Sequence, residues 1–289
     1  MITLKDYNKK IESLSNTQKI TRTMKMISAS KLRKVYKAQA EAKLYAKSLT
    51  AMIVRISTSV ESETHPLLMS RKNVQRVLIL IITSDKGLCG AFNHNANRCV
   101  DCWIKENRHH HEQIDLSCCG KKGFMYFQKR EKVKTHYDNV TSNPRFSDAK
   151  RIGADLSRSF LRGEYDEIYL SYNQFFNPFS QKTVFEKILP IDPYALSSEK
   201  LEKSREYIFE PAASELLAFL FPHFLYFKIY FALLENSAGE HGARMTAMDS
   251  ATKNSAELIE KNILYRNRVR QAQITRELIE ITGGAEALK

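Results

Sequence analysis

The feature that most constrains this chain is an uninterrupted helical pattern at its amino end. Between Leu4 and Ile56 there is neither proline nor glycine, and apolar residues recur at steps of three and four. At about 1.5 Å per residue, such a helix would be roughly 80 Å long, more than a globular domain needs for its own helices. A helix of this length needs a long partner.

The apolar positions of this helix predict a coiled-coil seam whose phase slips twice. The steps of three and four are regular inside three blocks and break between them. The blocks are Leu4, Tyr7, Ile11 and Leu14; Ile20, Met24 and Ile27; and Val35, Ala38, Ala42, Tyr45, Leu49, Met52 and Ile56. We therefore expect a helix whose surface is uneven along its length.

A second long helical pattern runs from Ala212 to about Ile281, before Gly283 and Gly284 end it. Its apolar positions are Met245, Met248, Ala256, Ile259, Ile263, Val269 and Ala272, with polar Asn254, Asn262 and Arg266 among them. The two terminal helices can pair antiparallel if the chain between them folds as a separate body beside them.

Residues 216–234 are almost entirely apolar and approach the length that spans a bilayer. Lys228 near the centre and His223 weigh against a span, and flanking Glu215 and Glu235 are poor interfacial anchors. A soluble helix packed on several sides has the same composition. We favour this core interpretation.

The middle of the chain has the pattern of an α/β domain. Its strand-like runs are residues 76–84, 113–119, 132–137, 167–175 and 182–191. The first three gaps are long enough for helices, whereas the last two runs are separated only by FNPFSQ, which predicts an antiparallel hairpin at one edge.

Positive charge is concentrated in the first helix. Residues 1–56 contain 13 lysines and arginines against 3 acidic residues, whereas residues 212–289 contain 9 of each, in a chain of net charge +13. The basic segment could approach DNA, an anionic membrane or an acidic protein surface. The first residues lack an apolar signal core and the composition of a transit peptide, so we expect the chain to stay in the compartment where it is made.

The five cysteines cluster in one region, which favours reduced thiols over a disulfide framework. Cys99 and Cys102, Cys118 and Cys119, and the run His109 to His111 invite a zinc interpretation. However, the first pair falls in an expected helix, and adjacent cysteines on a strand point to opposite faces. Four ligands on one metal are therefore disfavoured.

The stretch TSDKGLCGAFN, residues 83–93, follows the first strand-like run and contains Gly87 and Gly90. It has neither the spacing of a P-loop nor that of a dinucleotide turn. A tight turn in which glycines allow positive φ explains it better. Cys89, expected to be exposed here, has no histidine base in the local sequence, which disfavours a catalytic thiol.

Other catalytic constellations are equally weak. The sequence has no Gly-x-Ser-x-Gly and no His-Glu-x-x-His pattern. Asp166 and Glu167, at the start of a strand, are expected to be solvated edge charges. The motifs alone indicate no reaction.

Several blocks resemble the γ subunit of F-type ATP synthase, the central shaft of a rotary motor. They follow the family's order and approximate spacing over essentially the whole chain, and the resemblance thins between about 97 and 150. The blocks are NTQKITRTMKMISASKLRK, ETHPLL, TSDKGLCGAFN, GEYDEIYLSYNQFFNPFSQ, YIFEP, LFPHF, ARMTAMDSATKN and RNRVRQAQITRELIEITGGAEAL.

The resemblance implies an α/β fold in which a long antiparallel coiled coil of the terminal helices accompanies a central Rossmann-like domain. The implied boundaries are 1–60 for the first helix, 75–192 for the central domain, 193–211 for a connecting foot and 212–289 for the second helix. The implied function is that of a non-catalytic rotor subunit that couples ion-driven rotation of the c ring to ATP synthesis or hydrolysis at the β subunits. No cofactor and no metal are implied.

The resemblance also implies partners and a location. The implied partners are the α and β subunits of the catalytic ring, the ε subunit and the c ring, and no nucleic acid. The implied location is the cytoplasmic face of a bacterial inner membrane. By matching positions, the residues expected to contact β are Arg22, Met24, Lys25, Lys86, Cys89, Arg244, Arg270, Gln271 and Thr275. Tyr207 and Glu210 are expected at the foot that meets ε and the c ring, and the glycine loop would face β.

Some features depart from the family's pattern. Gly239 and Gly242 stand where the family usually has serine or alanine, which predicts a locally softer shaft because glycine costs about 1 kcal/mol in a helix interior. The cysteine pairs and His109 to His111 have no assigned role, and the dithiol insertion of plant γ subunits is absent.

Two other classes of function remain as alternatives. A basic coiled coil that binds nucleic acid would show affinity that falls steeply with salt, although the first helix has few aromatic residues for bases. A nucleotide-dependent enzyme built on the central domain is disfavoured by the incomplete glycine motif. The family blocks favour the rotor.

Overall fold

The computed structural model describes residues 3–57, 66–71, 73–192, 210 and 213–286. They form two compact units, one made of residues 29–243 and the other of residues 1–28 with 244–289. Each unit contains part of both long helices, α1 (Leu4–Ser57) and α5 (Ala213–Glu286). The domain boundaries expected from the sequence remain a prediction.

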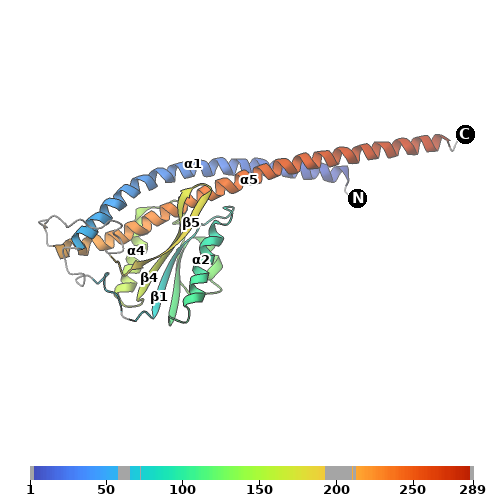
Figure 1. The fold of residues 1–289 in the computed structure, drawn as a ribbon. Coiled ribbons are helices and arrows are strands. Elements are labelled where there is room, and N and C mark those ends of the chain that lie inside the picture. Colours follow the sequence, from blue (N-terminus) through green and yellow to red (C-terminus); the bar gives the residue numbers. More distant parts are fainter. Residues whose placement is uncertain (1–2, 58–65, 72, 193–209, 211–212, 287–289) are drawn as a thin grey trace. The chain divides into compact units, whose positions relative to one another are not determined.

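The larger unit contains a five-stranded sheet of order β3-β2-β1-β4-β5. Figure 1 labels β1, β4 and β5 of this sheet. The strands are β1 (Arg76–Ile82), β2 (Gln113–Cys119), β3 (Val133–Tyr137), β4 (Glu167–Asn177) and β5 (Ser180–Leu189). The first four are parallel, and β5 pairs antiparallel with β4. The Rossmann-like α/β body and the edge hairpin are therefore confirmed, with a shorter turn, Pro178 and Phe179, than FNPFSQ suggested.

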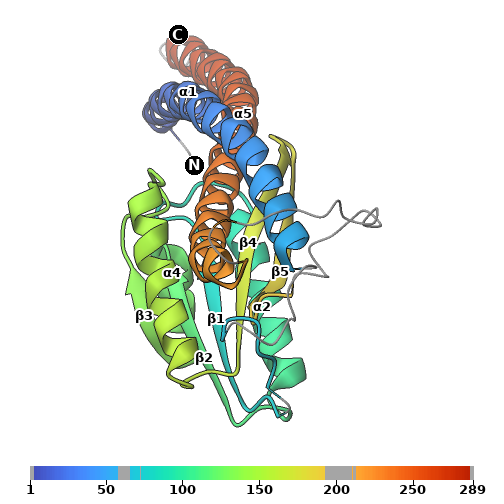
Figure 2. The ribbon, with the colours of Figure 1, turned by 90° about the vertical axis from the view of Figure 1, so that its left-hand side faces the viewer.

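Helices cover both faces of this sheet, as Figure 2 shows. They are α2 (Phe92–Asn107), α3 (Lys121–Phe127) and α4 (Phe146–Leu161), together with α5. Side chains of β1 alternate between the two faces, as a strand requires. Ile79 packs in the cluster under α2 and α3, whereas Leu80 packs with α4 and α5.

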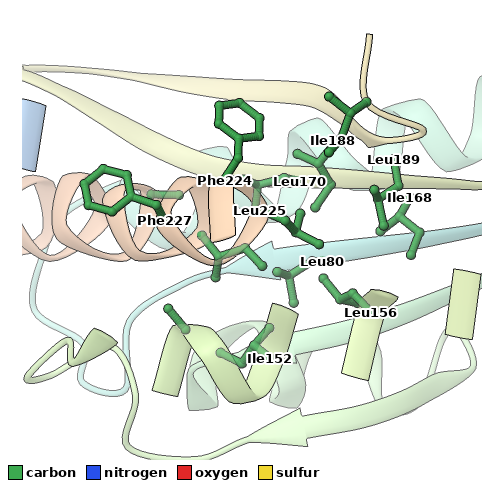
Figure 3. Close-up of a cluster of buried hydrophobic side chains, with 14 of the residues drawn as sticks. Leu80, Ile152, Leu156, Ile168, Leu170, Ile188, Leu189, Phe224, Leu225 and Phe227 are labelled. Atoms are coloured by element: carbon green, nitrogen blue, oxygen red, sulfur yellow. The ribbon is translucent and has the colours of Figure 1, made fainter. Parts of the chain in front are cut away.

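The apolar stretch of α5 lies in the larger of these clusters. Phe224, Leu225 and Phe227 are buried among residues of α4, β4 and β5 (Figure 3). By length and composition α5 would pass as a membrane span. Its packing against the sheet instead supports the core interpretation of residues 216–234.

The five cysteines are free, with Cys89 in the loop after β1 and the other four on two separate elements. Cys99 and Cys102 are on α2, and Cys118 and Cys119 end β2. Cys118 packs in the cluster under α2 and α3, and Cys119 in the opposite cluster. Their side chains therefore point to opposite faces, and the described residues contain no group of three potential metal ligands.

We expect the thiols to react with an alkylating reagent in a fixed order. Burial raises the pKa of Cys118 to about 12, and both strand cysteines are fully buried, whereas Cys102 is exposed. Because the thiolate is the nucleophile, Cys102 should be modified first at pH 8 and Cys118 only on unfolding. Mass spectrometry of peptides from native and urea-treated protein checks this order. Early labelling of Cys118 would contradict it.

The smaller unit is an antiparallel pairing of α1 with α5. The Tyr7 and Tyr265 rings stack with centroids 6.3 Å apart, and the Thr21 and Thr252 hydroxyls are 2.8 Å apart. Pairing the beginning of one helix with the end of the other is the arrangement expected from the sequence.

The seam of this pairing does not follow the predicted phase slips. Half-buried and buried positions continue at steps of four and three through Leu14, Gln18, Thr21, Lys25 and Ser28. The heptad spacing is therefore kept, and polar residues occupy it.

The apolar residues assigned to the middle block mostly lie outside the seam. Ile20 and Ile27 are 61% and 52% exposed. In the larger unit Tyr45 and Met52 are 47% and 49% exposed, and Ala46 and Ile53 are the more buried neighbours, although the Tyr45 ring still packs on Phe227 with centroids 4.6 Å apart. The apolar pattern misplaced the seam because part of it is polar.

Candidate partner-binding surfaces

The glycine loop after β1 is a tight turn held by Asn93 of α2. The amide of Ser84 donates to Asn93 Oδ1 at 2.9 Å, and Asn93 Nδ2 donates to Ser84 Oγ at 2.7 Å. Positive φ falls on Leu88 and Gly90, not on Gly87. The turn therefore fixes its own geometry without a ligand.

Cys89 does not have the exposure expected of it. Its side chain is 3% exposed, and Asn93 Nδ2 lies 3.2 Å from its sulfur. Lys86 is exposed, and Leu88 is 62% exposed. Lys86 and Leu88 are the large side chains that this loop exposes, and Cys89 supports the turn from inside.

A nucleotide in a Rossmann-like fold binds at the carboxyl ends of the strands where the strand order reverses. In this chain that place lies between β1 and β4, and α5 fills it. Asn236 Nδ2 donates to the Thr83 carbonyl at 3.3 Å, and Asn236 Oδ1 accepts from the Asn173 amide at 3.5 Å. The geometry argues against a nucleotide-dependent enzyme.

Gly239 and Gly242 allow α5 to lie close to its neighbours in the larger unit. A Cβ added to Gly239 would come within 2.9 Å of the Phe92 ring. One added to Gly242 would meet Phe175 at 3.0 Å and the Pro178 backbone at 3.1 Å. Tight packing offsets the helix-propensity cost, so the expectation of a softer shaft does not follow from these glycines.

In the smaller unit, the amino-terminal candidates behave differently from one another. Arg22 is exposed and Met24 is half-buried. Lys25 Nζ forms an ion pair with Asp249 Oδ1 at 2.6 Å, and hydrogen bonds from Lys25 and Lys253 lower the Asp249 pKa. Lys25 thus joins the two helices of the coil while remaining 44% exposed.

Arg22, Lys25 and Asp249 border a small groove between the two helices. It has a volume of about 220 Å³, and its lining is Gln18, Lys19, Arg22, Lys25, Asp249 and Thr252. Three cations and one carboxylate give the groove a positive field that suits acidic side chains of a partner.

The carboxyl-terminal part of α5 is exposed all round. Every residue from 270 to 284 is exposed, including the candidates Arg270, Gln271 and Thr275. Ile274, Leu278 and Ile281 are 48%, 58% and 68% exposed and follow helical spacing. They form an apolar stripe that the described part of the chain does not cover.

The remaining candidates have distinct positions. Arg244, on α5, is 7% exposed, so any contact with a partner would involve little of its side chain. Glu210 is exposed. Tyr207 lies outside the described residues.

Sequence reasoning missed the buried polar residues of α5. Glu235 and Asn236 are 4% and 0% exposed, and both hydrogen-bond to the sheet. A signal existed, because the polar and small run ENSAGEHG directly follows the apolar stretch 216–234. A polar and small run of this kind in a long helix indicates that the helix packs there against a polar surface and no longer against an apolar core.

These features define a partner-binding class of protein, with an α/β body and a pair of long helices whose described residues leave apolar side chains exposed. A family model described as ATP synthase matches residues 3–288. The ATP synthase gamma chain of Geobacter metallireducens is 42% identical over 289 residues and that of Trichlorobacter lovleyi 40% identical over 292 residues, each covering 100% of both chains. The chain belongs to the ATP synthase gamma-chain family.

Solved structures agree with this assignment. A chain of the Tetrahymena thermophila mitochondrial ATP synthase central stalk and c ring matches with a TM-score of 0.62 and 26% identity, over 80% of this chain and 99% of that one. A chain of the Euglena gracilis mitochondrial ATP synthase shares the fold, with a TM-score of 0.65 and 19% identity over 99% and 94%. The gamma chain is the non-catalytic central-stalk rotor subunit, and catalysis lies on the β subunits.

Proposed function

We propose that this chain turns inside a ring of α and β subunits, which contact the smaller unit. The observation that carries the proposal is the exposed stripe of Ile274, Leu278 and Ile281, in the segment 270–284 of α5 where every residue is exposed. A helix of a soluble protein buries such a stripe against something. An enclosing ring with an apolar inner surface would meet this requirement.

Contacts with β would come from exposed cations and polar groups of both helices. Arg22 on α1 and Arg270, Gln271 and Thr275 on α5 are exposed and suit acidic or polar partners, because a guanidinium binds carboxylates in a bidentate manner. Lys86 would add a contact from the glycine loop.

Coupling would follow from the uneven surface of the helix pair. Its seam is partly polar and its outside carries isolated apolar residues such as Ile20 and Ile27, so different faces differ in chemistry. A rotor of this kind presents a different face to each of three equivalent β subunits. Rotor angle and nucleotide affinity are then reciprocally linked, and ion flow can drive ATP release or hydrolysis can drive rotation.

The foot of the rotor would include Tyr207 and Glu210, with ε and the c ring as partners. Membrane association would then be indirect, through the c ring, at the cytoplasmic face of a bacterial inner membrane. The support is the family assignment together with bacterial relatives at about 40% identity over their full length.

Reconstitution tests the proposed contacts. The purified chain is mixed with the α and β subunits of its host, and assembly and ATPase turnover are recorded. Changing Arg270, Gln271 and Thr275 together to alanine should weaken the complex by about 2 kcal/mol or more and lower multisite turnover, because interface arginines are often hot spots.

An Arg98→Ala variant is the matched control, because Arg98 is an exposed arginine on α2. It should leave assembly and turnover unchanged. If α and β ignore the unmodified chain while it binds DNA with a steep salt dependence, the proposed contacts are wrong and a basic coil for nucleic acid takes their place.

A further inference from the structure

Helix α5 carries buried polar residues where it passes the sheet of the larger unit. Glu235, Asn236 and Ser237 are 4%, 0% and 0% exposed. Burying polar groups, and carboxylates above all, costs free energy unless they find partners. The partners of Glu235 and Asn236 lie on elements that are far apart in the sequence.

Glu235 joins three elements at one carboxylate. Its Oε1 accepts a hydrogen bond from Nε2 of Gln39 on α1 at 2.6 Å. Its Oε2 accepts from the backbone amide of Phe175 on β4 at 2.7 Å. Gln39 itself is only 8% exposed, so both bonds form away from water.

The neighbouring residues extend this network into the sheet. Asn236 bonds to the Thr83 carbonyl and the Asn173 amide. Asn173 in turn donates to the Phe92 carbonyl at 3.1 Å and accepts from Thr183 Oγ1 at 2.7 Å. The network thus reaches from α5 to α2 and both strands of the hairpin.

Such bonds resist movement in a way that apolar contacts do not. Hydrophobic burial is non-directional, whereas a hydrogen bond is lost beyond about 3.5 Å or below about 120°. A displacement of α1 by about 1 Å would therefore break the Gln39 bond and leave a buried carboxylate oxygen unpaired. The apolar contacts of α1 in this unit, such as those of Ala42 and Leu49, carry no such requirement.

We propose that Glu235 is a positioning residue that fixes α1 against α5 and the sheet. Torque then passes from the α/β body to both helices without movement of α1 relative to α5. This inference rests on the proposed rotor function and adds to it the residue through which α1 is held. Gln39 is its partner on α1, and the Phe175 amide is its anchor on β4.

The test uses the complete enzyme, assembled with this chain as γ, in inverted membrane vesicles. ATP hydrolysis and the ATP-driven membrane potential, followed with a voltage-sensitive dye, are measured in the same vesicles. Gln39→Leu removes the donor on α1. Glu235→Gln can keep both hydrogen bonds if the Gln39 amide turns over, so it is the conservative variant.

The control is Tyr165→Phe, which removes a buried hydrogen bond from Tyr165 to Asp115, 2.7 Å long, inside the α/β body. We expect Gln39→Leu to keep hydrolysis and to lose much of the potential per ATP hydrolysed, and Glu235→Gln and Tyr165→Phe to keep the potential. Gln39→Met repeats the test, with the same expected loss, if the leucine variant does not assemble.

Two results would overturn the inference. One is an unchanged ratio of potential to hydrolysis in the Gln39 variants, and the other is an equal deficit in Tyr165→Phe, which would indicate general loosening of the body. Failure of the unmodified chain to assemble or to support any potential would instead overturn the rotor function, and the inference with it.

Discussion

Replacing Asp166 with alanine should lower the free energy of unfolding of the chain by about 2–4 kcal/mol, because two backbone amides and an arginine lose a charged acceptor and a hydrogen bond to a charged group contributes about 1.5–3 kcal/mol. The Asp166 side chain is 5% exposed, and its Oδ1 forms an ion pair with Arg71. Its Oδ2 accepts hydrogen bonds from the backbone amides of Gln75 and Arg76 at 2.9 and 2.8 Å. The substitution leaves all these donors without their acceptor.

The position of Asp166 explains the size of this effect. It lies just before β4 and bonds to the first residue of β1, the parallel neighbour of β4. One carboxylate thus aligns the amino ends of the neighbouring strands β1 and β4 and holds the segment that precedes β1. Urea denaturation followed by circular dichroism measures the change in stability.

Asp138→Ala serves as the control because the Asp138 side chain is 68% exposed. It should alter stability by no more than about 0.5 kcal/mol. A loss of less than about 1 kcal/mol in Asp166→Ala would show that the bonds to Asp166 are dispensable for the sheet.

The same carboxylate should make stability depend on pH. Desolvation tends to raise the Asp166 pKa, but the Arg76 amide, Arg71 and the Gln75 amide outweigh it and lower the pKa below its ordinary value of 3.8. Since the folded-state pKa is depressed, the contribution is complete above the unfolded-state pKa and is lost as pH falls through the folded-state pKa. The unmodified chain should therefore lose stability below a pH of about 4 as Asp166 is protonated. The Asp166→Asn variant should not show this part of the loss in urea denaturation at the same pH values.

Asp166 also shows where sequence reasoning ends. Its place at the start of a strand favoured a solvated edge charge, and that expectation was wrong. Glu167 is likewise held, with its side chain 12% exposed and paired with Lys187. The partners of Asp166 lie about 90 residues earlier in the chain. Local patterns carry no information about such a distant donor.

The elements themselves were predictable because their signals are local. The continuous apolar run of β1 and the absence of proline and glycine in α1 act through backbone sterics and burial within a few residues. The pairing of the two long helices followed from their length alone.

The prediction of the seam residues failed for a physical reason. A method that follows apolar residues assumes that the inside of a coil is apolar, and here Thr21, Ser28, Ser255 and Asn262 are buried while Ile27 is exposed. The exposed apolar residues support the proposed function, because an isolated coil gains no stability from apolar side chains that face water. A helix pair that works inside a partner can carry its apolar groups outward.

Filling the polar seam should stabilise the helix pair. The Thr21 and Thr252 hydroxyls meet at 2.8 Å beside the groove of about 220 Å³, which leaves room for larger side chains near Thr252. Thr21→Val combined with Thr252→Leu should add about 1–3 kcal/mol to the local stability of the pair, because aliphatic groups replace hydroxyls at one buried and one half-buried position. Hydrogen exchange of the amides of residues 15–28 and 248–262 measures the gain.

Thr23→Leu is the matched control, because Thr23 is exposed on the outside of α1 and should leave protection unchanged. If the seam variant exchanges no more slowly than the unmodified chain, the polar contacts already stabilise the pair as well as apolar ones would. If protection rises as expected, the natural seam is weaker than the fold allows. Its polar residues then serve to fix register, as a single buried polar residue does in other coiled coils. The Lys25–Asp249 ion pair and the Thr21–Thr252 contact would set that register, because each is lost when one helix slides past the other.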